Sequence, residues 1–315
     1  MNAYRYLFGP VASRRYGRSL GVDLAVPKTC TFNCLFCQLG PTPQTTVVRT
    51  GTPPISGILA ELRRWLDSGK TTDFITACGS GEPTLHTHFG DLLRFVQSET
   101  PCRSLVLSNG SLFSLPEVRR DAALADVVKV SLHAWDQASF ERIARPNPSL
   151  RFDAILDGYR DFREQYDGRL DLEVFVVPGL NDSLEQARRI ADLAQTFAPD
   201  TIALNTAVRP PADGSVAVCP PERLQALTAL FGPAAQETGA EPTPGATALT
   251  EEALVALVSR HPVSLHALAA MTEKSETDLR TFLAPLIERG DLHFFEANDV
   301  LFAGAGQPPT ITRSL

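Results

Sequence analysis

Six short apolar segments alternate with segments of helical periodicity over residues 1–231, and this alternation limits the possible folds more than any other feature. The expected strands are 21–25, 74–78, 104–107, 127–132, 172–177 and 201–205, and the expected helices are 56–68, 89–99, 116–125, 152–166, 183–197 and 221–231. The helical segments repeat apolar residues every three or four positions. Strands that alternate with helices form a parallel sheet with the helices outside. The sequence therefore predicts an α/β fold, an open six-stranded (βα)6 partial TIM barrel.

Polar motifs follow five of these six expected strands, at the point where each strand ends. Three cysteines follow the first strand, and later strands are followed by Gly79–Glu82, Ser108 and Asn109, Ser131 and His133, and Pro178–Asn181. The carboxyl ends of parallel barrel strands meet at one end of the barrel, where catalytic side chains collect. We therefore expect the functional site at this end.

Cys30, Cys34 and Cys37 form a Cys-x3-Cys-x2-Cys loop after the first expected strand. Three thiolates this close in sequence can bind three irons of one [4Fe-4S] cube, and the apolar neighbours keep water away from it. The fourth iron then has no protein ligand. Three alternatives stay open: a zinc site completed by a fourth Cys or His from elsewhere, an electron-carrier ferredoxin with a fourth cysteine nearby, and a chance grouping of thiols.

The composition is typical of a globular protein without a membrane segment. The chain has 315 residues, 43% of them apolar, and no run of apolar residues long enough to span a membrane. No export signal is visible at the start, and three clustered cysteines favour metal chemistry over disulfides, so we expect a cytoplasmic protein. The formal net charge of −7 argues against a polyanionic partner.

About the last quarter of the chain, from residue 232, has a different organisation. Residues 232–248 are rich in Gly, Pro, Ala and Thr and are expected to be a linker. Three helical patterns and a hairpin around Ala297 and Asn298 predict a small winged helix-turn-helix domain over 249–305, followed by a tail at 306–315. This domain carries nine acidic and four basic residues between 249 and 306, so DNA is an unlikely partner. We expect it to bind a protein, a peptide or its own barrel.

The motifs of the first 231 residues resemble those of the radical S-adenosylmethionine (SAM) superfamily, and among its members the bacterial relatives of wyosine tRNA synthase. The resemblance rests on Gly9–Gly21, the cysteine loop with Gln38–Gly40, Gly79–Thr84, Arg145 and Pro146, Val177–Asp182, and Arg209–Pro211. It implies that SAM chelates the open iron and that an electron from the cluster splits SAM to a 5′-deoxyadenosyl radical. The implied enzyme abstracts hydrogen from an unidentified substrate.

The resemblance also implies which residues contact SAM. These are Phe36, Gly79, Gly81, Glu82, Pro83, Ser108, Asn109, Ser131, His133, Val176 and Pro178. The glycine-rich segment would receive the methionine ammonium group, because glycine lets the backbone approach closely. Ser108, Asn109 and Ser131 would contact ribose and carboxylate, and Val176 and Pro178 would flank the adenine. His133 stands where close relatives are expected to have an acidic residue, and a buried structural histidine is its alternative role.

Four arginines are candidate substrate contacts: Arg14, Arg15, Arg18 and Arg209. A guanidinium fork matches a carboxylate or phosphate, although such arginines can also lie on a solvated surface. The implied partners are an external low-potential electron donor of the flavodoxin or ferredoxin type and a small-molecule, peptide or RNA substrate. Two other functions stay open, a wyosine-synthase-like RNA-modifying enzyme and a redox-sensing regulator that uses the winged helix.

Overall fold

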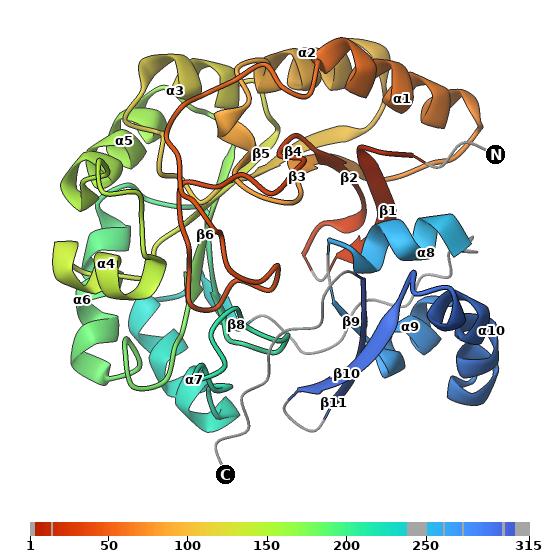
Figure 1. Ribbon diagram of the computed structural model, residues 1–315. Helices are drawn as coiled ribbons and strands as arrows, with labels where there is room; N and C mark the ends of the chain where they lie inside the picture. The colour runs from red at the N-terminus through yellow and green to blue at the C-terminus, as the bar shows by residue number, and fades with distance from the viewer. Residues whose placement is uncertain are drawn as a thin grey trace.

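An open, curved eight-stranded sheet forms the centre of the larger part of the molecule (Figure 1). The computed structural model describes residues 4–13, 15–237, 251–260, 262–272, 274–297 and 300–305. The strands follow one another in chain order across the sheet: β1 Leu7–Ser13, β2 Gly17–Asp23, β3 Phe74–Cys78, β4 Arg103–Leu107, β5 Val127–Ser131, β6 Arg169–Phe175, β7 Thr201–Asn205 and β8 Ala235–Glu237. Strands β2 to β8 are parallel, and β1 pairs antiparallel with β2.

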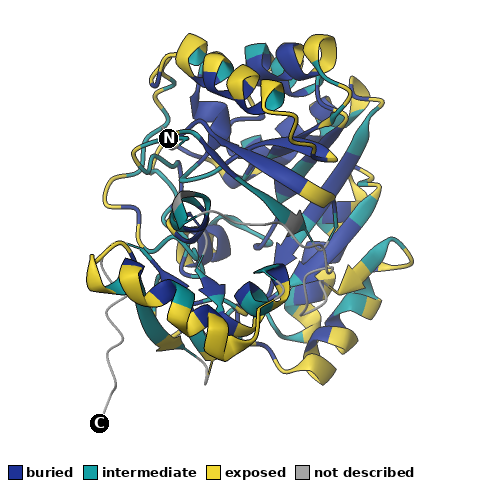
Figure 2. Ribbon diagram, turned by 90° about the vertical axis from the view of Figure 1, so that its right-hand side faces the viewer, coloured by how far each residue is buried: buried dark blue, intermediate teal, exposed yellow. Residues whose placement is uncertain are grey.

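Helices cover the outer face of this sheet, as a parallel sheet with crossover helices requires (Figure 1). They are α1 Ile55–Asp67, α2 Phe89–Glu99, α3 Pro116–Ala122, α4 Gln137–Ala144, α5 Phe152–Glu164, α6 Leu184–Gln195 and α7 Pro221–Thr228. Each presents an apolar stripe to the sheet; α1, for example, buries Ile58, Leu62 and Trp65. Figure 2 shows the result, with buried strands inside and exposed outer helix faces.

The predicted α/β architecture with a parallel sheet is confirmed, and the six expected strands correspond to β2–β7. The structure adds two edge strands, β1 and β8. Strand β8 lies inside the stretch expected to be a linker, where Ala235–Glu237 pair with β7. The sheet therefore continues into the stretch expected to be a linker. Residues 238–248 of the expected linker and the tail 306–315 lie outside the described residues.

The described residues of the C-terminal part form three helices and a small antiparallel sheet. The elements are α8 Glu251–Val258, β9 Val263–Ser264, α9 Leu265–Thr272, α10 Glu276–Glu288, β10 His293–Ala297 and β11 Val300–Gly304. The expected hairpin is β10–β11, and the two-residue strand β9 joins its edge as a third strand that the sequence did not predict. Ser275 accepts a hydrogen bond from the Asp278 backbone N–H and so caps the start of α10.

This C-terminal part packs directly on the barrel. Helix α8 lies against β1, and its Leu254 and Leu257 share an apolar cluster with Phe8 of β1 and Cys78 of β3 (Figure 1). The Phe8 ring lies over Gly21, where even a methyl group would come within 2.2 Å of the ring. Among the described residues, no helix is long and apolar enough to cross a membrane.

Candidate active site at the carboxyl ends of the strands

The cysteine loop leaves the carboxyl end of β2 and is fastened to the end of α4. The Asn33 and Leu35 N–H groups donate to the carbonyls of Ala144 and Ile143, at 3.1 and 3.2 Å. Phe32 and Leu35 are buried, while the three cysteines are partly exposed. The loop therefore holds its thiols at the mouth of the barrel, on an apolar base.

Two N–H donors point at the cysteine sulfurs. Lys28 Nζ lies 3.6 Å from Cys37 Sγ, and Asn109 Nδ2 lies 3.6 Å from Cys30 Sγ. Hydrogen bonds to sulfur and an apolar surrounding are features that tune the potential of an iron–sulfur cluster. Burial raises the pKa of the Cys30 thiol to about 12, with a smaller contribution from Glu82, so metal binding must drive its deprotonation.

The donor set fits a [4Fe-4S] cluster. It consists of three thiols on one short loop, with N–H donors on two of the sulfurs and no disulfide among them. In the part of the chain that the structure describes, no three Cys, His, Asp or Glu side chains converge on one point where they could hold a single metal ion. A cube has a different requirement, because each thiolate binds its own iron.

The Gly79–Glu82 turn lies between β2 and the cysteine loop and is in close contact with both. Gly79 has φ +122°, and a Cβ there would lie 2.3 Å from the Asp23 carboxylate. A Cβ on Gly81 would lie 1.8 Å from the Thr29 carbonyl oxygen, which accepts the Glu82 N–H at 3.0 Å. Only glycine fits at either position. Because these two positions carry no side chain, the backbone of the turn can lie close to the cysteine loop.

Glu82 is fully occupied by neighbours within the protein. Its carboxylate accepts from Ser108 Oγ at 2.7 Å, from Thr84 Oγ1 at 2.6 Å and from the Asn109 N–H at 2.7 Å. Burial raises the pKa of this carboxyl, and these hydrogen bonds oppose the shift. Glu82 and Ser108 therefore join the turn to the end of β4. The sequence predicted that both contact SAM, and the structure gives each of them an internal partner.

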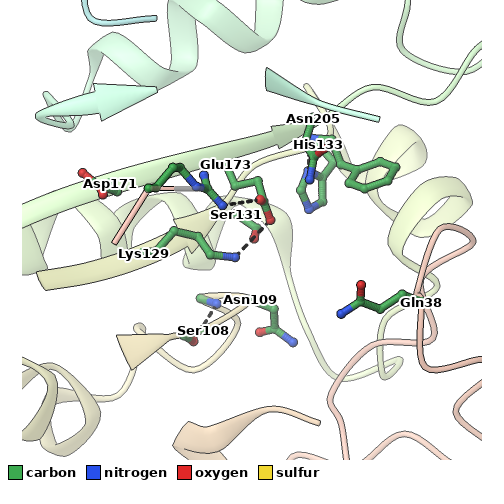
Figure 3. A network of polar contacts seen from close by, with 12 residues as sticks. Gln38, Ser108, Asn109, Lys129, Ser131, His133, Asp171, Glu173 and Asn205 are labelled. Atoms are coloured by element: carbon green, nitrogen blue, oxygen red, sulfur yellow. Dashed lines mark hydrogen bonds and ion pairs between the residues drawn. The ribbon is translucent and has the colours of Figure 1, made fainter. Parts of the chain in front are cut away.

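His133 lies in a cluster of rings at the end of β5 (Figure 3). Its Nδ1 accepts the Phe175 N–H at 2.8 Å, so its proton sits on Nε2. The Phe36 ring stands edge-on to His133 with centroids 4.8 Å apart and stacks on Phe175 at 4.0 Å. Burial lowers the pKa of His133 to about 4, so the imidazole is a neutral N–H donor.

The remaining predicted SAM contacts surround the same region. Asn109, Ser131 and His133 line a cavity that lies between the strand ends and helices α4 and α5. The Ser131 carbonyl is held by the Tyr159 hydroxyl at 2.8 Å. Pro83 is buried in the short helical turn after Glu82, Val176 is buried beside β7, and Pro178 is half-buried. The strand-end residues therefore come together at one mouth, as the fold predicts.

The low pKa of His133 makes a testable contribution to stability. The unfolded chain binds a proton on this imidazole below about pH 6.5, whereas the native state binds it only near pH 4. The free energy of unfolding therefore falls as the pH drops through this window, by up to about 3 kcal/mol. We expect the His133→Gln variant to lose less stability than the wild type between pH 7 and pH 4 in urea unfolding. An equal loss in both proteins would contradict the assignment.

Asp23 and Arg260 link the C-terminal part to the glycine-rich turn. Arg260 Nε lies 2.8 Å from Asp23 Oδ2, and the side chains of the pair are 10% and 0% exposed. The same carboxylate accepts the Ser80 N–H at 3.0 Å and the Ser80 hydroxyl. Arg260 also donates to the Arg5 carbonyl at 2.7 Å. One buried arginine of the C-terminal part therefore supports the turn beside the cysteine loop.

The predicted arginines do not form one group. Arg15 lies in the β1–β2 turn and reaches Glu173 of β6 at 2.9 Å. Arg18 lies at the other end of β2 from the cysteine loop, half exposed and 3.7 Å from Asp73, so the structure does not place it in the site. Arg209 donates to Gln38 Oε1 at 2.8 Å, beside the cysteine loop. Arg14 lies outside the described residues.

Comparison with known proteins identifies the chain. The family model of the radical SAM superfamily matches residues 25–194, more than half of the chain. The chain belongs to the radical SAM superfamily. It is 37% identical to a UPF0026 protein of Helicobacter pylori strain J99 over 65% of this chain and 67% of that protein. It is also 32% identical to the GTPase Obg of Brachyspira hyodysenteriae over 94% of this chain, but it spans only 44% of that relative.

A solved structure supports the same fold. The chain resembles a radical SAM methyltransferase from Sphaerobacter thermophilus with a TM-score of 0.50 and 20% identity, over 70% of this chain and 65% of that one. This likeness shows the fold alone. Members of the radical SAM superfamily, to which the chain belongs, use a [4Fe-4S] cluster and SAM. Enzymes of this superfamily need an electron donor and a substrate.

Four residues of the site region were not predicted from the sequence: Lys28, Asp23, Lys129 and Glu173. Lys28 has the weakest sequence signal, because a lone lysine near a loop is usually solvated. The other three carry a visible signal. Each is a charged residue inside a short strand whose neighbours are apolar, and in a barrel such a residue faces the interior when its neighbours face the helices.

Proposed function

We propose that this radical SAM enzyme abstracts a hydrogen atom from a small-molecule substrate held inside the barrel. The observation that carries the proposal is the arrangement at the mouth, where the cysteine loop, the Gly79–Glu82 turn and the end of β4 contact one another through Asn109, which lies 3.6 Å from Cys30 Sγ and donates its N–H to Glu82. Figure 3 shows Asn109, Gln38 and His133 on one side of the site region, and Lys129 and Glu173 toward the barrel strands.

Each part of the site has a role in this proposal. Cys30, Cys34 and Cys37 hold the cluster, which when bound supplies the electron that splits SAM into methionine and a 5′-deoxyadenosyl radical. The backbone of Gly79–Gly81 receives the methionine end of SAM, since that backbone is bare. Phe36 and the neutral His133 border the nucleoside beside Val176 and Pro178. The apolar base of the loop, with Phe32 and Leu35 buried, keeps water away from the cluster.

The proposal predicts that hydrogen moves from the substrate to the 5′ carbon of deoxyadenosine. The reduced holoenzyme is incubated with SAM and, in separate reactions, with the small-molecule, RNA and protein fractions of bacteria grown in D2O. We expect mass spectrometry to find deuterated 5′-deoxyadenosine with the small-molecule fraction. If only the RNA or the protein fraction supplied deuterium, the substrate would be an RNA or a protein and not a small molecule. If no fraction supplied deuterium, the result would contradict hydrogen abstraction.

The other roles follow from the same proposal. We infer that the electron donor is a flavodoxin or ferredoxin type of protein and that the enzyme works in the cytoplasm, where its free cysteines stay reduced. We also infer that α8–α10 with β9–β11 are a winged-helix domain, since three helices and a hairpin in this order are its minimal parts. Its packing on the barrel favours a structural role over DNA binding. Wyosine-type RNA modification and redox-sensing regulation stay predictions of the sequence.

A further inference from the structure

The barrel interior holds a group of three charged side chains, Arg15, Lys129 and Glu173, that we call the lumen cluster. Lys129 Nζ lies 3.0 Å from one oxygen of Glu173, and Arg15 Nη2 lies 2.9 Å from the other. One carboxylate is thus shared by two cations. The three side chains are 12–17% exposed, so solvent reaches the cluster. Figure 3 shows Lys129 beside Glu173.

The positive charge of the lumen cluster is not cancelled by its surroundings. Burial raises the pKa of Glu173, but Lys129 and Arg15 outweigh burial and hold that pKa well below its usual range, so Glu173 is a single negative charge. The next carboxylate, Asp171, accepts from Arg169 at 2.8 Å, Tyr16 at 2.9 Å and Thr201 at 2.7 Å. It is balanced by Arg169. His133 is neutral above about pH 4.

Hydrogen-bond donors in the cluster are left over as well. Arg15 Nη1 is buried and has no acceptor among the residues that the structure describes. The Lys129 ammonium has three donors, and the one hydrogen bond it makes within the described residues goes to Glu173. A buried donor without an acceptor is unfavourable, and a cation in a largely dehydrated interior attracts an anion far more strongly than one in water does. An oxyanion satisfies both requirements.

We propose that the substrate carries an oxyanion, a carboxylate or a phosphate, which binds Lys129 and Arg15 beside Glu173. This rests on the proposed function, because it describes the substrate of the same site. Lys129 and Ser131 point to the same face of β5, and Glu173 lies opposite Ser131 on the neighbouring strand β6. The anion therefore binds inside the barrel next to the strand end that carries Ser131.

Anion binding can be measured without knowing the substrate. The thermal unfolding midpoint of the anaerobic holoenzyme is recorded while inorganic phosphate, or in a second series succinate, replaces chloride at constant ionic strength. We expect the midpoint to rise in at least one series, which also distinguishes the phosphate from the carboxylate. The apparent affinity should fall about tenfold in Lys129→Met, recover in Lys129→Arg, and rise about tenfold in Glu173→Gln, since that variant removes the competing carboxylate. Lys70→Met, which removes an exposed lysine, is the matched control and should behave as wild type.

The proposal is tested by the opposite changes in anion affinity that are expected in Lys129→Met and Glu173→Gln. No effect of either anion on the wild type, unchanged affinity in Lys129→Met, or weaker binding in Glu173→Gln would each overturn the proposal and leave the cluster a structural ion pair. Formation of 5′-deoxyadenosine is measured in the same preparations. Anion binding without SAM cleavage would contradict the proposed function alone, and SAM cleavage without anion binding would contradict this inference alone.

Discussion

Replacing Cys34 by alanine is expected to abolish cluster binding and SAM cleavage together. Anaerobic reconstitution of the wild type should load about four irons and four sulfides per chain, because one cube accounts for all three loop cysteines. Losing a ligand leaves two thiolates for the cube. Even a changed outer partner of a metal ligand costs roughly 10–100-fold in affinity or activity, so we expect the loss in Cys34→Ala to exceed that range. Iron and sulfide analysis measures it, and Cys30→Ala and Cys37→Ala should behave alike.

The chain provides matched controls for this experiment. Cys78, Cys102 and Cys219 lie outside the loop. The Cys102 thiol donates weakly to the Thr72 carbonyl, at the amino ends of β3 and β4 and so at the end of the sheet opposite the mouth. Alanine at any of these three positions should leave the iron content unchanged. Loss of the cluster in one of them, or eight irons in the wild type, would be inconsistent with a single site held by three cysteines.

The Arg260→Ala variant should lose about 3–5 kcal/mol of unfolding free energy, because it leaves the buried Asp23 carboxylate without its cation. Urea unfolding of the holoenzyme measures this loss. We also expect weaker SAM binding, since Asp23 holds both the Ser80 N–H and the Ser80 hydroxyl in the glycine-rich turn. Equilibrium dialysis with labelled SAM reports that second effect separately.

Arg289→Ala is the matched control for Arg260→Ala. Arg289 lies in the same C-terminal part and also contacts two carboxylates, those of Glu251 and Asp291, but its side chain is 52% exposed. Exposed ion pairs contribute little, so neither stability nor SAM binding should change measurably. If Arg260→Ala behaved like Arg289→Ala, the C-terminal part would be an independent domain rather than a support of the SAM site.

Much of the barrel follows from local sequence patterns. Strands β3, β4, β5 and β7 are short, largely apolar runs that end at or directly before Gly, Ser or Asn, and the predicted bounds of α2 are those of the structure, since its apolar spacing is regular. Strand β8 has three residues, too few to show a period, and it forms because β7 offers a free edge. Helix α4 was missed although Asp136 and Ser139 form a capping box before it.

The candidate site also has one part that the sequence predicts and another part that it does not. The cysteine loop is contiguous in sequence, and its spacing favours an iron–sulfur cluster. The SAM contacts assigned to the strand-end motifs follow from the resemblance of these motifs to the superfamily. The pairs that complete the site join distant residues: Lys129 and Glu173 are 44 positions apart, and Asp23 and Arg260 are 237 apart. No local pattern encodes such partners. Glu82 is the opposite case: its motif is recognisable in the sequence, but its partners Ser108 and Asn109 directly follow a different strand, β4.

The central claim is that the open iron of one cluster brings SAM to reductive cleavage, and one measurement tests it most directly. The holoenzyme is reduced with dithionite under strict exclusion of oxygen, SAM is added, and 5′-deoxyadenosine and methionine are quantified by chromatography beside a Cys34→Ala control. The account predicts slow formation of both products in equal amounts by the wild type and none by the variant. Wild-type protein that carries a complete cluster and forms no more 5′-deoxyadenosine than Cys34→Ala would contradict it.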